Sequence, residues 1–263
     1  MMFVSFPLTL LLALYCAVTI HAWDGGGHRI CARIARNIIP PPMLHHLERT
    51  VLNASMDEIA NELDEFRGRK VGVDMLYYHT LEYDYTPSDS ADKLLAYMNE
   101  SRDYIDRDYA LFAIHFICDL HQPLHVLPKS RVSASFDAIP WLDGRNVTLH
   151  ALWDLLPEFR QVSHVVYADW LIERITPVTF MTTVENSCMS LWLDGRANAY
   201  RQADKFNAAL KSCHETAANE TQARICNMKF VSNTQQLVEN SLIYGGLRLA
   251  AHMYMTYLRV FVT

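Results

Sequence analysis

The chain has 263 residues, about half of them hydrophobic, with only 9 Gly and 10 Pro and a formal net charge of −6. A chain of this length and composition can bury a sizeable core as one domain, and no repeat, low-complexity stretch or linker divides it. The acidic balance argues against an extended basic groove of the kind that many nucleic-acid-binding proteins use.

The first 22 residues predict a secretory signal peptide. They contain no Lys, Arg, Asp or Glu, carry an apolar run over 8–14 and end in the small-residue site Ile20-His-Ala22, although a positively charged start is missing. The alternative is an uncleaved signal anchor, because the stretch is just long enough to span a bilayer. Cleavage would leave one mature domain, residues 23–263, without a stable membrane span, secreted or in a secretory/lysosomal lumen.

Cleavage after Ala22 would also leave a free amine on Trp23. An α-amino group and its own carbonyl oxygen form a five-membered chelate ring with a metal ion. His28 is close enough in sequence to join them. We therefore expect the mature N-terminus to take part in metal binding.

Apolar residues recur at helical spacing nearly throughout, and no stretch alternates with period two, so the sequence predicts an all-α, multi-helix bundle. The predicted helices span 28–37, 43–52, 56–66, 91–101, 104–121, 149–156, 167–175, 178–192, 197–213 and 227–260. Segment 126–147 is the only long irregular stretch. A loop of this length is usually functional or mobile, and a β-hairpin within it is one option. The last helix contains Arg248, His252 and Arg259, which favours core packing over a membrane anchor.

The densest chemical pattern is a group of histidines and aspartates. His115 and Asp119 are four residues apart, as are His150 and Asp154, so each pair can lie on one helix face and point at one ion. Residues 109–120 are otherwise almost wholly apolar. A carboxylate beside an imidazole in a buried helix is costly unless something pairs with it, and a metal cation is the simplest partner.

Several motifs together resemble the S1/P1 nuclease family. They are Trp23-x4-His28, Asp64-x2-Arg67, His79, His115-x3-Asp119-x-His121-Gln-Pro-Leu-His125 and His150-x3-Asp154, and the likeness continues to Tyr244-Gly-Gly-Leu-Arg-Leu-Ala250. The family comprises secreted zinc enzymes that cut single-stranded nucleic acid and remove 3′-phosphates. The resemblance implies a single all-α domain of the phospholipase C and zinc nuclease type, with a trinuclear zinc cleft.

The resemblance implies three zinc ions held by nine positions, all with suitable residue types. The first ion would be held by Asp64, His79, His115 and Asp119, the second by His125, His150 and Asp154, and the third by the amine and carbonyl of Trp23, His28 and Asp119, which bridges to the first. His121 is not a ligand in the family, and we expect it to orient a neighbouring group. Arg67 matches the family's phosphate arginine, with a surface ion pair as the alternative.

The expected mechanism follows from charge, because zinc lowers the pKa of bound water to about 7. Hydroxide between the two ions that share Asp119 would attack phosphorus, and the ion at His125 would stabilise the leaving 3′-oxygen. The expected substrates are single-stranded DNA or RNA and 3′-nucleotides, and the enzyme is expected to act as a monomer.

The chain departs from the family pattern at positions that concern the substrate. Glu62 stands where the family usually has tryptophan, and Thr80 stands where an aromatic residue helps to hold a nucleobase. Glu82 replaces the family's aspartate there and could still accept a hydrogen bond from a base edge. The family's Gly-Gly-Asn segment between His125 and His150 is absent. Because Thr80 offers no ring for stacking, we expect weak discrimination among bases.

The mature chain would hold five cysteines, which leaves at least one unpaired: Cys31, Cys118, Cys188, Cys213 and Cys226. Cys213 and Cys226 flank a polar loop and are predicted to form a disulfide. Cys118 is most simply a small buried thiol, and Cys31 and Cys188 could pair only if their helices meet. Four sequons support a secreted glycoprotein and begin at Asn53, Asn99, Asn146 and Asn219.

Three functions compete on the sequence. The leading hypothesis is a zinc nuclease with 3′-nucleotidase activity. A zinc phospholipase C shares the all-α trinuclear architecture, but its last ligand is a glutamate where Asp154 stands, and it has no match to Arg67. The third hypothesis is a non-catalytic zinc- or nucleotide-binding relative that lost the Gly-Gly-Asn segment. The intact ligand set argues against that third hypothesis.

Overall fold

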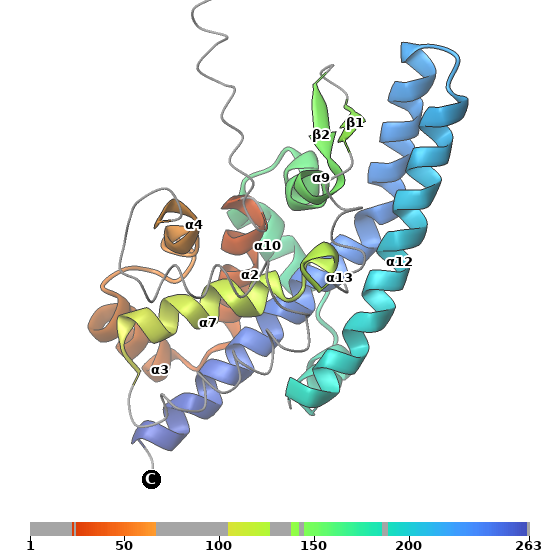
Figure 1. Ribbon diagram of the computed structural model, residues 1–263. Coiled ribbons are helices and arrows are strands. Elements are labelled where there is room, and N and C mark those ends of the chain that lie inside the picture. Colours follow the sequence, from red (N-terminus) through yellow and green to blue (C-terminus); the bar gives the residue numbers. More distant parts are fainter. Residues whose placement is uncertain are drawn as a thin grey trace, which may run out of the picture.

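The computed structural model describes residues 23, 25–66, 105–126, 138–141, 145–185 and 189–261. These residues form a mostly helical structure, which confirms the predicted all-α class (Figure 1). The predicted signal peptide, the helix over 91–101, and the site residues Arg67 and His79 lie outside the described residues. Within the described part, no helix is long and apolar enough to cross a membrane.

Helices dominate the order of elements along the chain. Those of the N-terminal half are α2 (Gly25–Ile38), α3 (Pro41–His46), the π-helical turn η2 (Leu47–Leu52), α4 (Glu62–Phe66), α7 (Arg107–Asp119) and the 3-10 turn η3 (Pro123–Val126). The C-terminal half contains β1 (Ala138–Pro140), β2 (Asn146–Thr148), α9 (Leu149–Leu155), η4 (Leu156–Arg160), α10 (His164–Glu173), α11 (Pro177–Glu185), α12 (Met189–Thr216) and α13 (Glu220–Phe261).

The helix starts follow from capping side chains, which hydrophobic periodicity does not reveal. Asp106 accepts a hydrogen bond from the Tyr109 amide at 2.8 Å, so α7 begins at Arg107 rather than at the predicted residue 104. Ser163 caps α10 in the same way, so α10 begins at His164, three residues before the predicted start. Such caps satisfy amide groups that the first helical turn leaves without a partner.

One predicted helix is largely wrong. The segment predicted as a helix over 56–66 is a series of turns as far as residue 61, and only Glu62–Phe66 is helical. A side chain takes the place of a backbone acceptor here, because the Glu48 carboxylate accepts a hydrogen bond from the Met56 amide at 3.1 Å. The short helix α4 that remains carries Asp64.

The long helix α13 packs against three other helices of the bundle, α2, α7 and α12 (Figure 1). Two glycines let α2 approach it closely. A Cβ atom added to Gly246 would lie 2.5 Å from Ile34 Cβ, and one added to Gly245 would lie 3.1 Å from Cys31 Sγ. The Gly-Gly pair therefore sets the distance between the last helix and the helix that carries His28.

A short hairpin lies in the segment that the sequence left irregular. Strands β1 and β2 pair antiparallel, with Ile139 opposite Val147. Strand β2 leads directly into α9, so the hairpin fixes the entry to the helix that carries His150 and Asp154.

The disulfide pattern confirms one prediction and corrects another. Cys213 and Cys226 are bonded, as predicted, and join α12 to α13. Cys118, however, is not a free thiol: it is bonded to Cys31, with the two Cα atoms 6.1 Å apart. The prediction failed because α2 and α7 are 87 positions apart in sequence at this bond, and their contact appears only once the bundle is packed.

Candidate metal centre

Two helices bring the first group of metal ligands together. His28 on α2 and His115 on α7 stack their rings with centroids 4.6 Å apart. The Asp119 carboxylate faces both rings, with Oδ1 2.8 Å from His28 Nε2 and Oδ2 3.1 Å from His115 Nε2. All three side chains are buried, and their donor atoms lie within 4.8 Å of one another.

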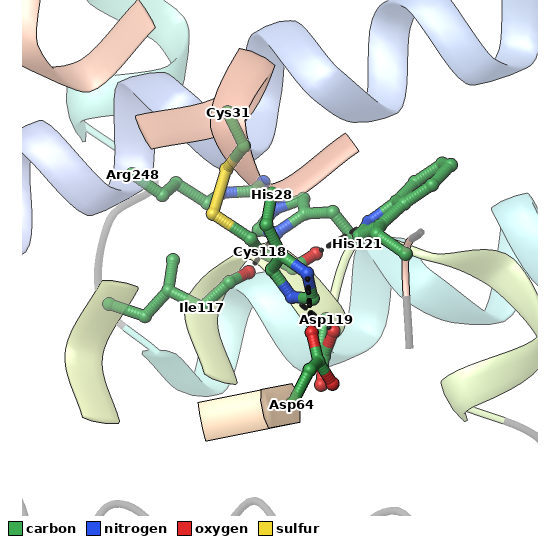
Figure 2. Close-up of a disulfide and its surroundings, with 9 residues drawn as sticks. His28, Cys31, Asp64, Ile117, Cys118, Asp119, His121 and Arg248 are labelled. Carbon is green, nitrogen blue, oxygen red and sulfur yellow. Dashed lines mark hydrogen bonds and ion pairs between the residues drawn. A yellow bond between two sulfur atoms is a disulfide. The ribbon is translucent and has the colours of Figure 1, made fainter. Parts of the chain in front are cut away.

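Asp64 completes this group from a third element, α4. Its Oδ2 atom lies 3.3 Å from His28 Nδ1 and 4.0 Å from His115 Nδ1, so the two imidazoles lie between two carboxylates. In Figure 2 the Asp64 and Asp119 carboxylates lie close together beside His28. The side chain of Asp64 is only 5 % exposed, which places a second anionic group inside the fold.

The second group of ligands lies on η3 and α9. The rings of His125 and His150 stack at 4.7 Å, and Asp154 lies 3.7 Å from His125 Nε2 and 3.6 Å from His150 Nε2. The Thr148 hydroxyl caps α9 by accepting from the Ala151 amide at 3.1 Å. This cap fixes the start of α9, so that His150 and Asp154 occupy one helix face.

Asp119 links the two groups, because its Oδ2 atom also lies 3.8 Å from His125 Nδ1. Gln122 positions Asp154 of the second group. Its side-chain amide donates to Asp154 Oδ1 at 2.6 Å, and its carbonyl oxygen accepts from the Leu124 amide. Gln122 was not predicted to have this role, although its place between His121 and His125 in the His-Gln-Pro-Leu-His motif was a usable signal.

Two buried carboxylates have oxygen atoms that a metal ion would satisfy. Asp119 Oδ2 and Asp154 Oδ2 are fully covered, and neither accepts a hydrogen bond from the described residues. An uncompensated buried carboxylate oxygen is costly. Each of these oxygens faces imidazole nitrogens, and a set of imidazole and carboxylate donors at a few ångströms is the combination that zinc prefers. The residues present therefore fit zinc.

The electrostatics of the first group lead to the same result. Burial by itself raises the pKa of Asp119, but the positive charges of His115, His28 and His125 outweigh it and hold this pKa well below its usual range. Burial likewise lowers the pKa of His28, yet Asp119 and Asp64 raise it to about 10. A proton on His28 therefore balances the two carboxylates when no metal is bound, and a metal ion has to displace it.

The first residue of the predicted mature chain lies beside this centre. The Trp23 side chain is fully buried, and its indole nitrogen donates to the carbonyl of Cys118, the neighbour of Asp119, at 2.9 Å. Gly27 leaves room for it, since a Cβ atom there would lie 2.8 Å from Trp23 Cβ. The indole thus fixes the start of the predicted mature chain next to Asp119.

His121 faces away from the ligand groups and bonds to the protein on both sides (Figure 2). A carbonyl oxygen can only accept, so His121 Nδ1 donates to Ile117 O at 2.6 Å, and Nε2 accepts from Arg248 Nη1 at 2.7 Å. His121 therefore ties the end of α7 to α13. Sequence reasoning missed Arg248 in this role, because nothing in the chain signals a contact 127 positions away.

The fold and the site together define a class: an all-α protein with a buried histidine–aspartate centre suited to zinc. Comparison with known families narrows this class. The family model described as S1/P1 Nuclease matches residues 23–257, and the chain belongs to that zinc-dependent nuclease family. A search of curated proteins finds no match, so the family model carries the assignment. Membership makes the protein a hydrolase of the nuclease type, with nucleic acid as its substrate.

Proposed function

We propose that the protein is a secreted zinc enzyme that cleaves single-stranded DNA and RNA to 5′-nucleotides and removes 3′-phosphates from nucleotides. The observation that supports it most is the pair of buried ligand groups linked through Asp119 in a member of this family. A phosphodiester needs several positive charges placed around one phosphorus atom. Two adjacent groups of neutral imidazoles and carboxylates are suited to hold the cations that supply them.

The proposed centre holds three zinc ions. His115, Asp119 and Asp64 would serve one ion together with His79. His28 and the Trp23 amine would serve another, with Asp119 shared between the two, while His125, His150 and Asp154 serve the third. When bound, zinc lowers the pKa of a water ligand to about 7 and neutralises charge on phosphate oxygens.

The chain's own residues position these charges. Gln122 donates to Asp154 and leaves the other carboxylate oxygen directed at His150. The Trp23 indole, bonded to the Cys118 carbonyl, holds the chain start beside Asp119. Arg67 follows directly after α4, the helix that carries Asp64, and is proposed to bind a phosphate oxygen with its guanidinium group.

Secretion and processing belong to the same proposal. Removal of residues 1–22 would convert the amide of Trp23 into an amine, which is the better metal ligand. Three sequon asparagines are exposed among the described residues, where an attached sugar would meet solvent: Asn53 at the end of η2, Asn146 at the start of β2 and Asn219 just before α13.

The test is zinc-dependent turnover by the mature chain beginning at Trp23. Single-stranded DNA, RNA and 3′-AMP should all be hydrolysed, a chelator should abolish turnover, and zinc should restore it. Phosphatidylcholine vesicles are the counter-substrate. Hydrolysis of the lipid without cleavage of nucleic acid would instead identify a phospholipase C. Full zinc loading without turnover of any of these substrates would identify a non-catalytic relative.

A further inference from the structure

A polar cavity lies between α2, η2 and the start of α10, on a different face of α2 from the metal ligand His28. Its volume is about 830 Å³, and its lining includes Arg29, Arg33 and Arg36 of α2, Arg49 of η2 and His164 of α10. We call it the arginine cavity. The three arginines of α2 lie three and four residues apart, so they share one helix face. Arg29 directly follows the ligand His28, and at 3.6 residues per turn the two side chains leave the helix about 100° apart.

Two of these arginines already have anionic partners. Arg33 holds Asp169 with two hydrogen bonds of 2.9 and 3.2 Å and lies 3.5 Å from Asp57. Arg36 holds Glu48 with two hydrogen bonds of 2.6 and 3.2 Å. The remaining acid of the lining, Glu58, accepts from the Ser55 amide at 3.4 Å. Asp57 also lies 3.8 Å from Arg36 Nε, although its Oδ1 atom accepts no hydrogen bond from the described residues. Each carboxylate of the lining therefore has a partner in the described residues.

Arg29 is different. No described residue forms an ion pair or hydrogen bond with it, and its Nε atom is fully covered without an acceptor. A covered guanidinium nitrogen with no acceptor costs free energy that a bound anion would recover. His164 faces the same space. Burial lowers the pKa of His164, and the charge of Arg29 lowers it further, while Asp57 partly opposes this shift.

We propose that the arginine cavity binds a phosphate group, with Arg29 as its main ligand and His164 and Arg49 at its sides. Arginine suits phosphate because its planar fork matches the spacing of phosphate oxygens. The cavity is larger than one phosphate and lies within the size range of small-molecule and cofactor sites. The source of the phosphate rests on the proposed function: it is either the backbone of a substrate strand that extends past the zinc centre, or the free phosphate that 3′-nucleotidase activity releases.

The test needs a readout local to this cavity, because the zinc centre also binds phosphate. The ring signals of His164, assigned by comparison with His164→Gln, provide it by nuclear magnetic resonance. Every sample is the zinc-loaded mature chain with Ser55→Ala, which removes the sequon at Asn53 and leaves the left-handed backbone of Asn53 (φ 54°) in place. The probes are inorganic phosphate and a single-stranded oligonucleotide with non-hydrolysable linkages.

The His164 signals should shift saturably with at least one probe, and at least about tenfold more probe should be needed in Arg29→Gln. The matched control is Arg224→Gln, on an exposed arginine whose ion-pair partner is Glu220, and it should bind as the parent does. Tighter binding of the oligonucleotide than of phosphate identifies a strand site, and the reverse identifies a site for free phosphate. The proposal would be overturned if neither probe shifted the His164 signals. It would also be overturned if Arg29→Gln and the parent bound the probe with equal affinity.

Zinc content and turnover of 3′-AMP are measured on the same samples. Arg29→Gln should leave both unchanged, because Arg29 forms no hydrogen bond or ion pair with the described ligand residues. Failure of the proposed function would appear as absent turnover in the parent itself. Failure of the arginine cavity would appear only in the His164 signals, so the two outcomes are distinguishable.

Discussion

At the scale of single residues, Asp119 is the residue that connects the two groups of metal ligands. Its two oxygens face His28 and His115 at 2.8 and 3.1 Å, and the second oxygen lies 3.8 Å from His125. Burial raises the pKa of this carboxylate, but the neighbouring imidazoles outweigh burial and hold the pKa well below its usual range, so Asp119 is anionic at neutral pH. One carboxylate thus contacts both groups of ligands, and its removal should weaken metal binding by both groups.

The first prediction follows from this position. Asp119→Asn keeps the size of the side chain but removes the charge, so two of the three proposed ions lose a shared ligand. Zinc content should fall from about three to about one per chain, and turnover should fall at least about a hundredfold. Elemental analysis and a 3′-AMP assay measure the two effects. Asp169→Asn, on an exposed aspartate that pairs with Arg33, is the control and should retain its zinc.

Gln122 gives a subtler prediction, because it touches a ligand and not the metal. Gln122→Met removes the 2.6 Å hydrogen bond to Asp154 while filling a similar volume. Loss of such a supporting contact typically weakens metal binding by about 10–100-fold. Competition with a chromophoric chelator gives the affinity of the weakest ion. Gln236→Met, which removes an exposed contact to Asn240, is the matched control. Equal affinities in both variants would show that Gln122 has no supporting role.

At the scale of elements, the contact between α2 and α7 fixes the positions of the metal ligands that these two helices carry. The Cys31–Cys118 disulfide joins them three residues after His28 and one residue before Asp119 (Figure 2). The indole of Trp23 bonds the Cys118 carbonyl, and Gly245 of α13 faces Cys31. The crosslink therefore lies directly behind the metal ligands, whereas Cys213–Cys226 joins two helices elsewhere in the bundle.

The chain thus offers a matched pair of disulfide deletions. Replacing Cys31 and Cys118 by alanine opens a separation of 87 residues, and replacing Cys213 and Cys226 opens one of 13. Chain entropy alone predicts losses of roughly 4–5 and about 3 kcal/mol in unfolding free energy. Only the first pair should also speed zinc loss to a chelator, measured well below both unfolding temperatures. Equal zinc loss in the two variants would contradict a positioning role for Cys31–Cys118.

The contact between α7 and α13 predicts a pH dependence that does not involve the metal. Burial, reinforced by Arg259, lowers the pKa of His252 to about 4, and the Tyr109 hydroxyl lies 2.7 Å from its Nε2 atom. Between pH 6.5 and 4 the unfolded chain therefore binds a proton that the folded chain excludes. Stability should fall over this range as pH drops, by up to roughly 3 kcal/mol.

Chemical unfolding at a series of pH values measures this effect. His252→Gln keeps a polar group opposite Tyr109 but cannot titrate, so its stability should fall less with acid than that of the wild type. The difference between the two curves isolates His252 from the metal ligands. His45→Gln, on an exposed residue, should follow the wild-type curve. Parallel curves for His252→Gln and the wild type would contradict the assignment.

At the scale of the whole molecule, the sequence predicted what depends on local pattern. Helical periodicity anticipated α2 and α9 closely, whereas α13 begins at Glu220, seven residues before its predicted start, and α12 continues through the break predicted between 192 and 197. Ligand spacing anticipated that His115 lies near Asp119 and His150 near Asp154, because residues four apart share a helix face. Prediction failed where distant segments meet. The Cys31–Cys118 bond, the Arg248–His121 contact and the arginine cavity all depend on how α2, α7, α10 and α13 pack, and local sequence pattern does not encode that packing.

The central claim is a trinuclear zinc centre closed by the mature N-terminus. Elemental analysis of the mature chain beginning at Trp23, compared with the same chain extended by one residue, tests it most directly. The claim predicts about three zinc ions per chain for the first protein and fewer, with lower turnover, for the second, because an amide is a poorer ligand than an amine. One zinc ion or none in the first protein after mild purification would contradict the claim.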